Sequence, residues 1–443
     1  MKNILIIGAE SSGMGAAILA RKNHYNVKIT SINKITKNNK ICLDQLAINF
    51  EEGLHSIDSV SWADLIIKSP GVPSNIPLII EANNQVVPIF SEIEFAASFT
   101  DAKIIAITGT NGKTTTSLLL YDMFLKAGLN VDLVGNIGIS FAESVALRRC
   151  DYYILELSSF QLDNIVNFKP NISIILNIQE DHLDRYDNQL YKYINSKINI
   201  IKNQDEDDLF IYFNKDLHIH SHLHKVKSQK YSFGPSKLKE NYGGWIQDNQ
   251  LIIQTIKTKF TMTIHNLALQ GNHNYYNSMA ASIAASSMDI DSDIIKKCLS
   301  DFKGVEHRLE FVTNVNGVHF VNDSKATNCN SVFYAIETIN KPIVWICGGI
   351  DKGNDYSILK NLVNNKVKSI VFIGDNSDKI IANFKDCTED ITIVKSMHEA
   401  VNTAHALAVD GDTVLLSPAC ASFDLFKNYE HRGRVFKSAV LSI

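Results

Sequence analysis

Short segments that are wholly or almost wholly apolar recur along the chain and alternate with longer segments whose apolar residues repeat at helical spacing. Examples are residues 4–7, 104–107, 172–176 and 343–347. Uninterrupted apolar runs of this length are typical of strands that are buried on both faces of a parallel sheet. The pattern therefore predicts an α/β protein whose ligand sites lie in the loops at the carboxyl ends of the strands.

The apolar runs form three blocks, each of which begins with its own strand. The polar stretch 98–101 and the turn at Lys303 and Gly304 separate them, so we expect domains at residues 1–100, 101–303 and 304–443. A chain of 443 residues suits about three domains of ~150 residues. Between residues 231 and 264 the pattern changes to alternating strands around an Asp248–Asn249 turn, which predicts a small antiparallel appendage on the middle domain.

Charge and composition exclude several classes of function. The formal net charge of -4 gives no excess of Lys and Arg, so we expect no nucleic-acid partner. No apolar run approaches the ~20 residues of a membrane span and no cleavage signal follows Met1, so we expect a cytoplasmic protein with no membrane partner. The seven cysteines are scattered and contain no C-x-x-C pair, which predicts reduced, structural thiols.

The strongest chemical signal is the segment 104–116, Ile-Ile-Ala-Ile-Thr-Gly-Thr-Asn-Gly-Lys-Thr-Thr-Thr, which reads as a strand, a glycine turn and a helix start. Backbone N–H groups of such a turn bind phosphates, Lys113 reaches the β- and γ-phosphate oxygens, and Thr114 can ligate Mg²⁺. The spacing departs from strict G-x-x-x-x-G-K-[ST], because Ile107 stands five positions before Gly112. We predict that ATP is bound by Gly109, Thr110, Asn111, Gly112, Lys113, Thr114 and Thr115.

Two further segments place polar residues after strands. Residues 152–161, Tyr-Tyr-Ile-Leu-Glu-Leu-Ser-Ser-Phe-Gln, put Glu156 at a strand end where Mg²⁺ is commonly held. Residues 177–184, Asn-Ile-Gln-Glu-Asp-His-Leu-Asp, place His182 after the next strand. Taken alone, each side chain is more often a hydrogen-bonded cap than a ligand. A nucleotide loop alone would equally suit motors, switches, kinases and ligases, so the combination of motifs decides the reaction class.

In combination these motifs resemble the Mur ligase family, over all three blocks. The resemblance rests on Gly-Thr-Asn-Gly-Lys-Thr-Thr (109–115), Leu-Glu-Leu-Ser-Ser-Phe-Gln (155–161), Asp-His-Leu-Asp (181–184), Gly-Asn-His-Asn (271–274), His-Arg (307–308), Asn-Asp-Ser-Lys-Ala-Thr-Asn (322–328) and Leu-Ser-Pro-Ala-Cys-Ala-Ser-Phe-Asp (416–424). The last two are most similar to the D-glutamate-adding members. The resemblance implies a Rossmann-like N-terminal domain for a UDP-substrate, a central parallel sheet like that of P-loop ATPases, and a Rossmann-like C-terminal domain for the amino acid.

The same resemblance implies an ATP-dependent ligase that joins D-glutamate to UDP-N-acetylmuramoyl-L-alanine in peptidoglycan precursor synthesis, with a monomer as the default state. An acyl phosphate would form first, and the D-glutamate amine would then displace phosphate. Two alternatives within this chemistry are a sibling ligase for another amino acid and a folylpolyglutamate-type ligase. From a different class, a nucleotide-binding regulator without turnover is suggested by the altered first block, where Glu10 and Ser31 depart from the family pattern.

The family's site residues map onto this chain by motif. Thr114 and Glu156 would hold one Mg²⁺, and His182 and Lys197 a second. Lys197 lies on a helix expected at 189–202 and is carbamylated in similar enzymes, which suits the chemistry because a neutral amine can take up CO₂ and present anionic oxygens to Mg²⁺. The remaining implied contacts are Asn272, Arg308 and Asp323 for ATP; Ser11, Ser12, Ser69, Asn136, Gln161 and His182 for the UDP-substrate; Lys325, Thr327, Lys352, Ser417 and Phe423 for D-glutamate; and Lys113, His182, Lys197 and Arg308 for catalysis.

One histidine run suggests a different kind of site. His218, His220, His222 and His224 alternate, so a strand would show all four on one face. A transition-metal site is conceivable there, but the stretch is polar and lacks a carboxylate or cysteine partner in the right pattern. We therefore interpret it as a solvated edge.

Overall fold

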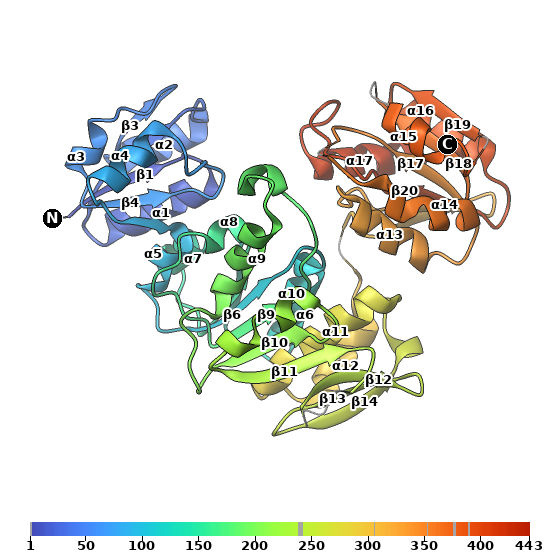
Figure 1. Ribbon diagram of the computed structural model, residues 1–443, viewed down its shortest axis with the longest axis horizontal. Helices are drawn as coiled ribbons and strands as arrows, with labels where there is room; N and C mark the ends of the chain where they lie inside the picture. Colours follow the sequence, from blue (N-terminus) through green and yellow to red (C-terminus); the bar gives the residue numbers. More distant parts are fainter. Residues whose placement is uncertain (1, 238–241, 305, 352, 375–377, 389) are drawn as a thin grey trace. The chain divides into compact units, whose positions relative to one another are not determined.

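The computed structural model describes residues 2–237, 242–304, 306–351, 353–374, 378–388 and 390–443, which fold around three sheets (Figure 1). One compact unit comprises residues 1–267 and 276–301 and contains the first two sheets. The other comprises residues 268–275 and 302–443 and contains the third. Among the described residues, no helix is both long and apolar enough to cross a membrane.

The first sheet is parallel throughout, with the strand order β3-β2-β1-β4-β5 of Rossmann-type folds. Its central strand β1 is buried over the predicted apolar run at residues 4–7. The strands are β1 (Asn3–Ile7), β2 (Asn26–Ser31), β3 (Asn49–Glu52), β4 (Leu65–Lys68) and β5 (Ile89–Ser91); the helices are α1 (Ser11–Lys22), α2 (Lys37–Gln45), α3 (Ser59–Trp62), α4 (Pro77–Asn84) and α5 (Glu92–Ala97).

The second sheet has the order β14-β13-β12-β11-β10-β9-β6-β8-β7 and is parallel from β7 to β12. Its strands are β6 (Lys103–Thr108), β7 (Val131–Gly135), β8 (Tyr152–Glu156), β9 (Ile172–Ile175), β10 (Leu209–Phe213), β11 (Gln229–Gly234), β12 (Gly243–Gln247), β13 (Gln250–Gln254) and β14 (Lys259–Thr263). Its helices are α6 (Lys113–Lys126), α7 (Phe141–Leu147), α8 (Ser159–Leu162), η1 (Leu183–Tyr186), α9 (Leu190–Ile198), η2 (Asn199–Ile201), α10 (Leu217–His220), η3 (Leu223–Lys225), η4 (Ile264–Asn266), α11 (Asn272–Ser287) and α12 (Ser292–Asp301).

The predicted antiparallel appendage is confirmed in part. Strands β12, β13 and β14 are antiparallel, and Asp248 and Asn249 form the turn between the first two, both with positive φ. The strands do not form a separate sheet, however. The strand β11, which contains Tyr231, pairs in parallel with both β10 and β12, so backbone hydrogen bonds continue the central sheet into the hairpin.

The third sheet has the order β15-β16-β20-β17-β18-β19, and only its edge pair β15 and β16 is antiparallel. The strand β17 is buried along its whole length, as its apolar run predicts. The strands are β15 (Glu310–Val315), β16 (Val318–Asn322), β17 (Ile343–Cys347), β18 (Val367–Ile373), β19 (Asp390–Val394) and β20 (Thr413–Leu416); the helices are α13 (Cys329–Thr338), η5 (Tyr356–Leu359), α14 (Lys360–Lys366), α15 (Asp378–Phe384), α16 (Met397–Leu407) and α17 (Tyr429–Val440).

The histidine run does not form a strand. Residues 217–225 form the short helical turns α10 and η3, because the Asp216 carboxylate accepts hydrogen bonds from the backbone N–H groups of His218 and Ile219 and so caps α10. The Nε2 atom of His220 lies 2.8 Å from the Asn214 carbonyl oxygen. The strand that would have placed all four imidazoles on one face is therefore absent from these residues.

Candidate active site

The predicted phosphate-binding loop lies between β6 and α6, so the expected strand, turn and helix are present. Gly112 has a φ of 86°, and a Cβ there would collide with the Asn277 side chain, so the position requires glycine. The loop is fixed by the segment after the neighbouring strand β9. The Asn177 carbonyl oxygen accepts from the Thr110 N–H, and its side-chain oxygen accepts from the Asn111 N–H, both at 2.9 Å.

Lys113 begins α6 with its side chain folded over the loop. Its amine donates hydrogen bonds to the carbonyl oxygens of Gly109 at 2.7 Å and Thr110 at 2.8 Å. The amine therefore already lies among the backbone groups that would surround a phosphate.

Glu156 ends β8 and is almost fully buried, at 1% exposure. One carboxylate oxygen accepts a hydrogen bond from the Asn136 amide at 2.9 Å. The other, Oε2, has no hydrogen-bond partner among the residues that the structure describes. A buried carboxylate oxygen without a donor is costly unless it meets a cation, so this site fits a hard divalent metal ion.

Lys197 lies near the end of α9 and is buried, at 2% exposure. Its amine donates to the Gly109 carbonyl oxygen at 2.9 Å and lies 4.6 Å from the centre of the Tyr193 ring. Burial, with the positive charge of Lys113, lowers the pKa of this amine well below its usual value. A neutral amine is the form that can react with CO₂.

His182 follows β9 and precedes η1. Its backbone has a φ of 52°, its ring is 41% exposed, and the ring lies edge-on against Phe160. With the loop at β6 and Glu156 at β8, the structure thus places three predicted elements of the site at the carboxyl ends of adjacent strands.

The predicted UDP-substrate residues divide into two groups. Ser11 and Ser12 begin α1, and the buried Ser69 follows β4. Asn136 and Gln161 lie on the second sheet, where both side chains already have protein partners. The Asn136 amide donates to Glu156, and the Gln161 oxygen accepts from the Ser158 N–H and hydroxyl, at 2.9 and 3.0 Å, in a capping box.

Glu10 does not disturb the glycine turn before α1. Its backbone is extended, with a φ of −92°, and its side chain is exposed. The glycine usual at this position in similar sequences is therefore not needed for backbone conformation. Gly13 is needed, because a Cβ there would collide with the Gly8 carbonyl.

In the second unit, Asp323 and Ser417 form a buried pair. The Ser417 hydroxyl donates to the Asp323 carboxylate at 2.8 Å, and the Leu309 N–H donates at 3.2 Å. Burial raises the pKa of Asp323 to about 7, although these two hydrogen bonds and the charge of Arg308 act against the shift. Because its hydroxyl is used in this hydrogen bond, Ser417 helps to hold the Asp323 carboxylate in place.

The other residues predicted in the second unit differ in exposure. Lys325 is half-buried, with its amine 5.0 Å from the centre of the Tyr429 ring. Phe423 is 66% exposed and Asn272 is also exposed. Thr327 and Arg308 are half-buried, and Lys352 lies outside the described residues.

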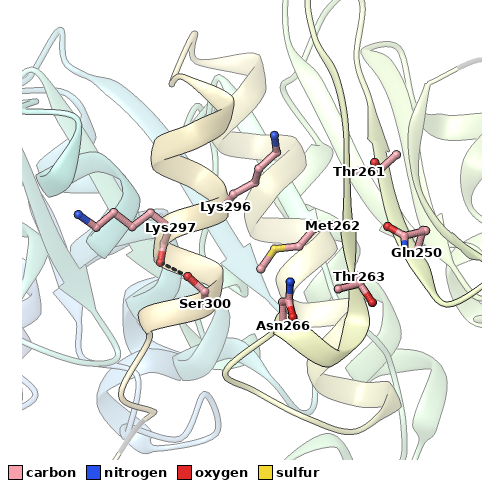
Figure 2. Close-up of a pocket in the computed structure, with 8 residues that line it drawn as sticks. All are labelled: Gln250, Thr261, Met262, Thr263, Asn266, Lys296, Lys297 and Ser300. Carbon is pink, nitrogen blue, oxygen red and sulfur yellow. Dashed lines mark hydrogen bonds between the residues drawn. The ribbon is translucent and has the colours of Figure 1, made fainter.

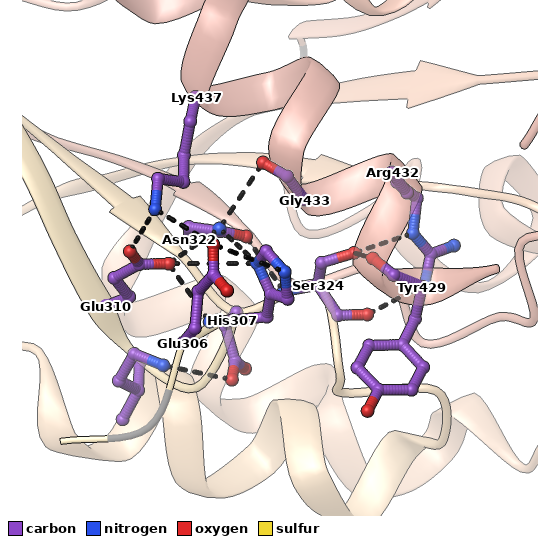
Figure 3. A network of polar contacts seen from close by, with 11 residues as sticks. Glu306, His307, Glu310, Asn322, Ser324, Tyr429, Arg432, Gly433 and Lys437 are labelled. Atoms are coloured by element: carbon purple, nitrogen blue, oxygen red, sulfur yellow. Dashed lines mark hydrogen bonds and ion pairs between the residues drawn. The ribbon is translucent and has the colours of Figure 1, made fainter.

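Arg432 was missed by the sequence analysis. It is 1% exposed and donates to the Ser324 hydroxyl at 3.0 Å and the Ser324 carbonyl at 2.8 Å (Figure 3). It also donates to the Cys420 carbonyl at 3.1 Å. It therefore fixes the segment 322–328 against the segment 416–424. The available signal was an arginine on the buried face of α17, although only the fold shows what it contacts.

Around His307 lies a cluster of Glu306, Glu310 and Lys437 (Figure 3). The two carboxylates and the imidazole have the spacing of a metal site. The Lys437 amine, however, lies 3.2 Å from Glu306 and 2.5 Å from Glu310. This ammonium already supplies the positive charge that a metal ion would bring, so we interpret the cluster as an ion-pair network beside Arg308.

Two family models match the chain. The Mur ligase middle domain covers residues 107–285, and the Mur ligase glutamate ligase domain covers residues 307–420. Curated relatives are similar along the whole length. One from Christiangramia forsetii is 46% identical over 444 residues, which is 100% of each chain. The chain belongs to the Mur ligase family.

The relative from Christiangramia forsetii is named UDP-N-acetylmuramoylalanine–D-glutamate ligase, and two further relatives of this Mur ligase carry the same name. The protein from Bacteroides thetaiotaomicron is 48% identical over 99% of both chains. The protein from Salinibacter ruber is 39% identical over 98% of this chain and 96% of its own.

Solved structures confirm the Mur ligase fold. The UDP-N-acetylmuramate-alanine ligase of Thermotoga maritima has a TM-score of 0.61 at 20% identity, covering 100% of this chain and 99% of its own. MurF of Acinetobacter baumannii has a TM-score of 0.64 at 16% identity, covering 98% and 93%. At these identities the likeness shows the fold alone.

A hollow of about 710 Å³ lies elsewhere on this Mur ligase, against β13, β14 and α12 (Figure 2). It is lined by Gln250, Thr261, Met262, Thr263, Asn266, Lys296, Lys297 and Ser300. None of these is among the predicted site residues. The hollow therefore gives no support to any predicted contact.

Proposed function

We propose that this chain is an ATP-dependent ligase that joins D-glutamate to UDP-N-acetylmuramoyl-L-alanine in peptidoglycan precursor synthesis. The observation that carries the proposal is full-length similarity: relatives 39–48% identical over 98% or more of the chain are all named UDP-N-acetylmuramoylalanine–D-glutamate ligase. Because the reaction consumes ATP, we place it in the cytoplasm, with a monomer as the simplest active form.

ATP binding is assigned to the loop 109–115. Its backbone N–H groups and the N-terminus of α6 would surround the phosphates, and the Lys113 amine would exchange two loop carbonyls for β- and γ-phosphate oxygens. Asn272, Arg308 and Asp323 are proposed as further nucleotide contacts. Arg308 suits the negative charge that develops on the transferred phosphoryl group.

Two Mg²⁺ ions are proposed, and the buried Glu156 oxygen without a donor supports the first of them. Thr114 and Glu156 would hold one, and His182 and Lys197 the other, since the free Glu156 oxygen is a ligand of the kind that Mg²⁺ prefers. When bound, the ions would neutralise charge on the phosphoryl group and orient its oxygens.

Lys197 is proposed to act as a carbamate. Its neutral amine would attack the carbon of CO₂, forming a C–N bond and releasing one proton to water. One π-bond electron pair of CO₂ moves to oxygen, so the product shares one negative charge between two oxygens where the neutral amine carried none. Support comes from the burial of the amine, which disfavours its charged form, and from its position at the Gly109 carbonyl.

The proposed reaction has two steps. An alanine carboxylate oxygen attacks the γ-phosphorus, the bond to the ADP oxygen breaks, and an acyl phosphate forms. The D-glutamate amine then attacks the acyl carbon, phosphate leaves with the bonding electrons, and the nitrogen loses a proton. In both steps the protein's main task is positioning and electrostatic stabilisation, to which Lys113 and Arg308 would contribute.

The substrates are assigned to opposite parts of the chain. Ser11, Ser12, Ser69, Asn136, Gln161 and His182 are proposed for the UDP-substrate, and Lys325, Thr327, Lys352, Ser417 and Phe423 for D-glutamate. Two lysines suit the two carboxylates of D-glutamate. Because the Ser417 hydroxyl donates to the buried Asp323 carboxylate, we propose that Ser417 supports the D-glutamate pocket by holding that carboxylate in place.

The decisive experiment measures ADP and phosphate release with ATP, Mg²⁺ and UDP-N-acetylmuramoyl-L-alanine, with D-glutamate or other amino acids. We expect product with D-glutamate only. Product with another amino acid would retain the ligase chemistry and overturn the assigned pocket. ATP binding without product, across D- and L-amino acids, would favour a regulator.

A further inference from the structure

Three consecutive carbonyl oxygens after β4 each accept a hydrogen bond from a basic side chain. Lys68 donates to Val72 at 3.0 Å. Arg185 donates to Gly71 at 3.3 Å and to Pro70 at 3.4 Å. We refer to residues 69–72 as the β4 loop. Lys68 ends a strand of the first sheet and Arg185 lies in η1 beside the second, so the loop is held by both parts of the first unit.

Lys68 is buried at the end of β4, at 4% exposure. Burial lowers the pKa of its amine, and the nearby Arg185 adds to this effect, whereas Asp163 opposes it. A buried lysine is unfavourable compared with an apolar residue of similar length. Packing alone would therefore favour an apolar residue at this position. The hydrogen bond to the Val72 carbonyl oxygen explains why an amine is present.

Arg185 connects the β4 loop to the segment that contains His182. It lies in η1, which begins directly after His182. Its guanidinium lies 4.7 Å from the centre of the Phe160 ring, and that ring lies 5.4 Å, centre to centre, from the His182 imidazole. One arginine therefore links the first sheet's loop to a proposed metal ligand.

Ser69 shows what the β4 loop presents. Its hydroxyl is buried and has no hydrogen-bond partner within the described part of the chain. A Cβ on Gly8 would lie 2.7 Å from this oxygen, and one on Gly13 would lie 3.3 Å from it. The hydroxyl thus lies at the glycine turn before α1, where backbone N–H groups favour a phosphate. A phosphate oxygen would satisfy it.

We propose that Lys68 and Arg185 are positioning residues that hold the β4 loop so that the Ser69 hydroxyl meets the diphosphate of the UDP-substrate. The inference rests on the proposed function and deepens it. Neither residue need touch a reacting atom. Arg185 also packs on the Phe160 ring, which contacts His182. Arg185 would therefore fix the position of the substrate's diphosphate relative to His182.

The test measures the affinity of the full chain for UDP-N-acetylmuramoyl-L-alanine by calorimetry, together with kcat and the KM values for this substrate and for ATP. In Arg185→Met we expect Kd and KM for the UDP-substrate to rise about tenfold, the loss of roughly one charged hydrogen bond. The KM for ATP should stay within about twofold of wild type, because the β4 loop is not part of the ATP loop. Arg185→Lys should recover part of the affinity, since it keeps one donor.

Lys68→Met separates positioning from stability. Replacing a buried amine by an apolar chain of similar length should leave the melting temperature unchanged or higher, while the UDP-substrate binds about tenfold more weakly. The control is Arg149→Met, an exposed arginine outside the proposed site, which should change neither quantity.

Two results would overturn the inference: a Kd for the UDP-substrate within twofold of wild type in both methionine variants, or an equal weakening of ATP binding. Its failure is distinguishable from failure of the proposed function. If the wild-type chain bound the UDP-substrate but formed no product, the ligase assignment would fail, and the Kd comparison would still decide the role of Lys68 and Arg185. Absence of any binding by the wild-type chain would overturn both.

Discussion

The Lys197 amine donates a hydrogen bond to the Gly109 carbonyl oxygen at 2.9 Å, although 88 residues separate them in the sequence. The same carbonyl accepts from Lys113 at 2.7 Å. Two lysine amines therefore converge on one backbone oxygen of the phosphate loop. Two ammonium groups so close would repel each other, and burial together with the charge of Lys113 lowers the pKa of Lys197 well below its usual value.

Replacing Lys197 by arginine should abolish ligation. Arginine remains protonated and cannot take up CO₂, so we expect kcat to fall by at least ~10²-fold, the scale seen when a group that stabilises transition-state charge is lost. Wild-type activity should also fall when CO₂ and bicarbonate are removed, and recover when they are restored. The control is Lys192→Arg, a half-buried lysine on the same helix whose amine pairs with the exposed Asp187. Full activity of Lys197→Arg would rule out the carbamate.

Replacing Lys113 by alanine should abolish phosphoryl transfer without unfolding the protein. The side chain is half-buried and donates hydrogen bonds to the Gly109 and Thr110 carbonyl oxygens of its own loop, so its loss should leave the core intact. We expect ADP release to fall by ~10³-fold, with a melting temperature within a few degrees of wild type. Lys126→Ala, at the exposed end of α6, is the control. Normal turnover in Lys113→Ala would refute the mechanism.

Replacing Glu156 by glutamine should weaken the response to Mg²⁺. The side chain keeps its shape and the oxygen that accepts from Asn136, but loses the charge that suits a divalent cation. We expect the Mg²⁺ concentration for half-maximal activity to rise at least tenfold, as is typical when the coordination of a metal site is disturbed. Glu206→Gln, an exposed change, should leave it unaltered. An unchanged Mg²⁺ requirement in Glu156→Gln would exclude this ligand.

Asp323 should make stability depend on pH. Its folded pKa is raised to about 7, whereas an unfolded aspartate titrates near ~3.9. Between these values the unfolded chain releases a proton that the folded chain keeps, so the free energy of unfolding should fall as pH rises from about 4 to about 7 and then level off. Asp323→Asn lacks this term, and the difference between the two proteins isolates it in denaturant titrations. A difference that did not vary with pH would contradict the raised pKa.

Ser417→Ala provides a second measurement on the same carboxyl group. The Ser417 hydroxyl donates to Asp323, which stabilises the charged form and lowers the pKa. Its removal should therefore shift the levelling-off of the stability curve to higher pH. Ser442→Ala, an exposed serine at the end of the chain, is the control for the loss of a hydroxyl. A shift to lower pH would show that the hydroxyl acts differently.

Local features of the sequence correctly predicted the strand, glycine turn and helix start around the proposed phosphate loop. The glycine at 112, the lysine after it and the apolar strand before them lie within a few residues of one another, so their geometry follows from local backbone rules. The position of Glu156 at the end of β8 followed in the same way, from an apolar run that stops at a carboxylate. The helix expected at 189–202 is also present, as α9 and η2.

Local reasoning was less successful where pairing across the sheet decides the structure. The strands around Asp248 were expected as an appendage, whereas β11 and β12 extend the central sheet. The histidine run alternates as a strand does, but the Asp216 cap gives helical turns. In both segments hydrogen bonds to neighbouring residues or strands override the residue pattern.

By itself, the sequence determined the α/β class, the phosphate loop and the strand-end residues, because neighbouring residues encode these features. Only the tertiary structure decided that Lys197 is buried against Gly109, that Arg432 joins two distant segments, and that Arg185 holds the β4 loop. The physical reason is that burial and long-range hydrogen bonds exist only after the sheets have formed. They change the charge state of a lysine or the role of an arginine without changing any residue near it in the sequence.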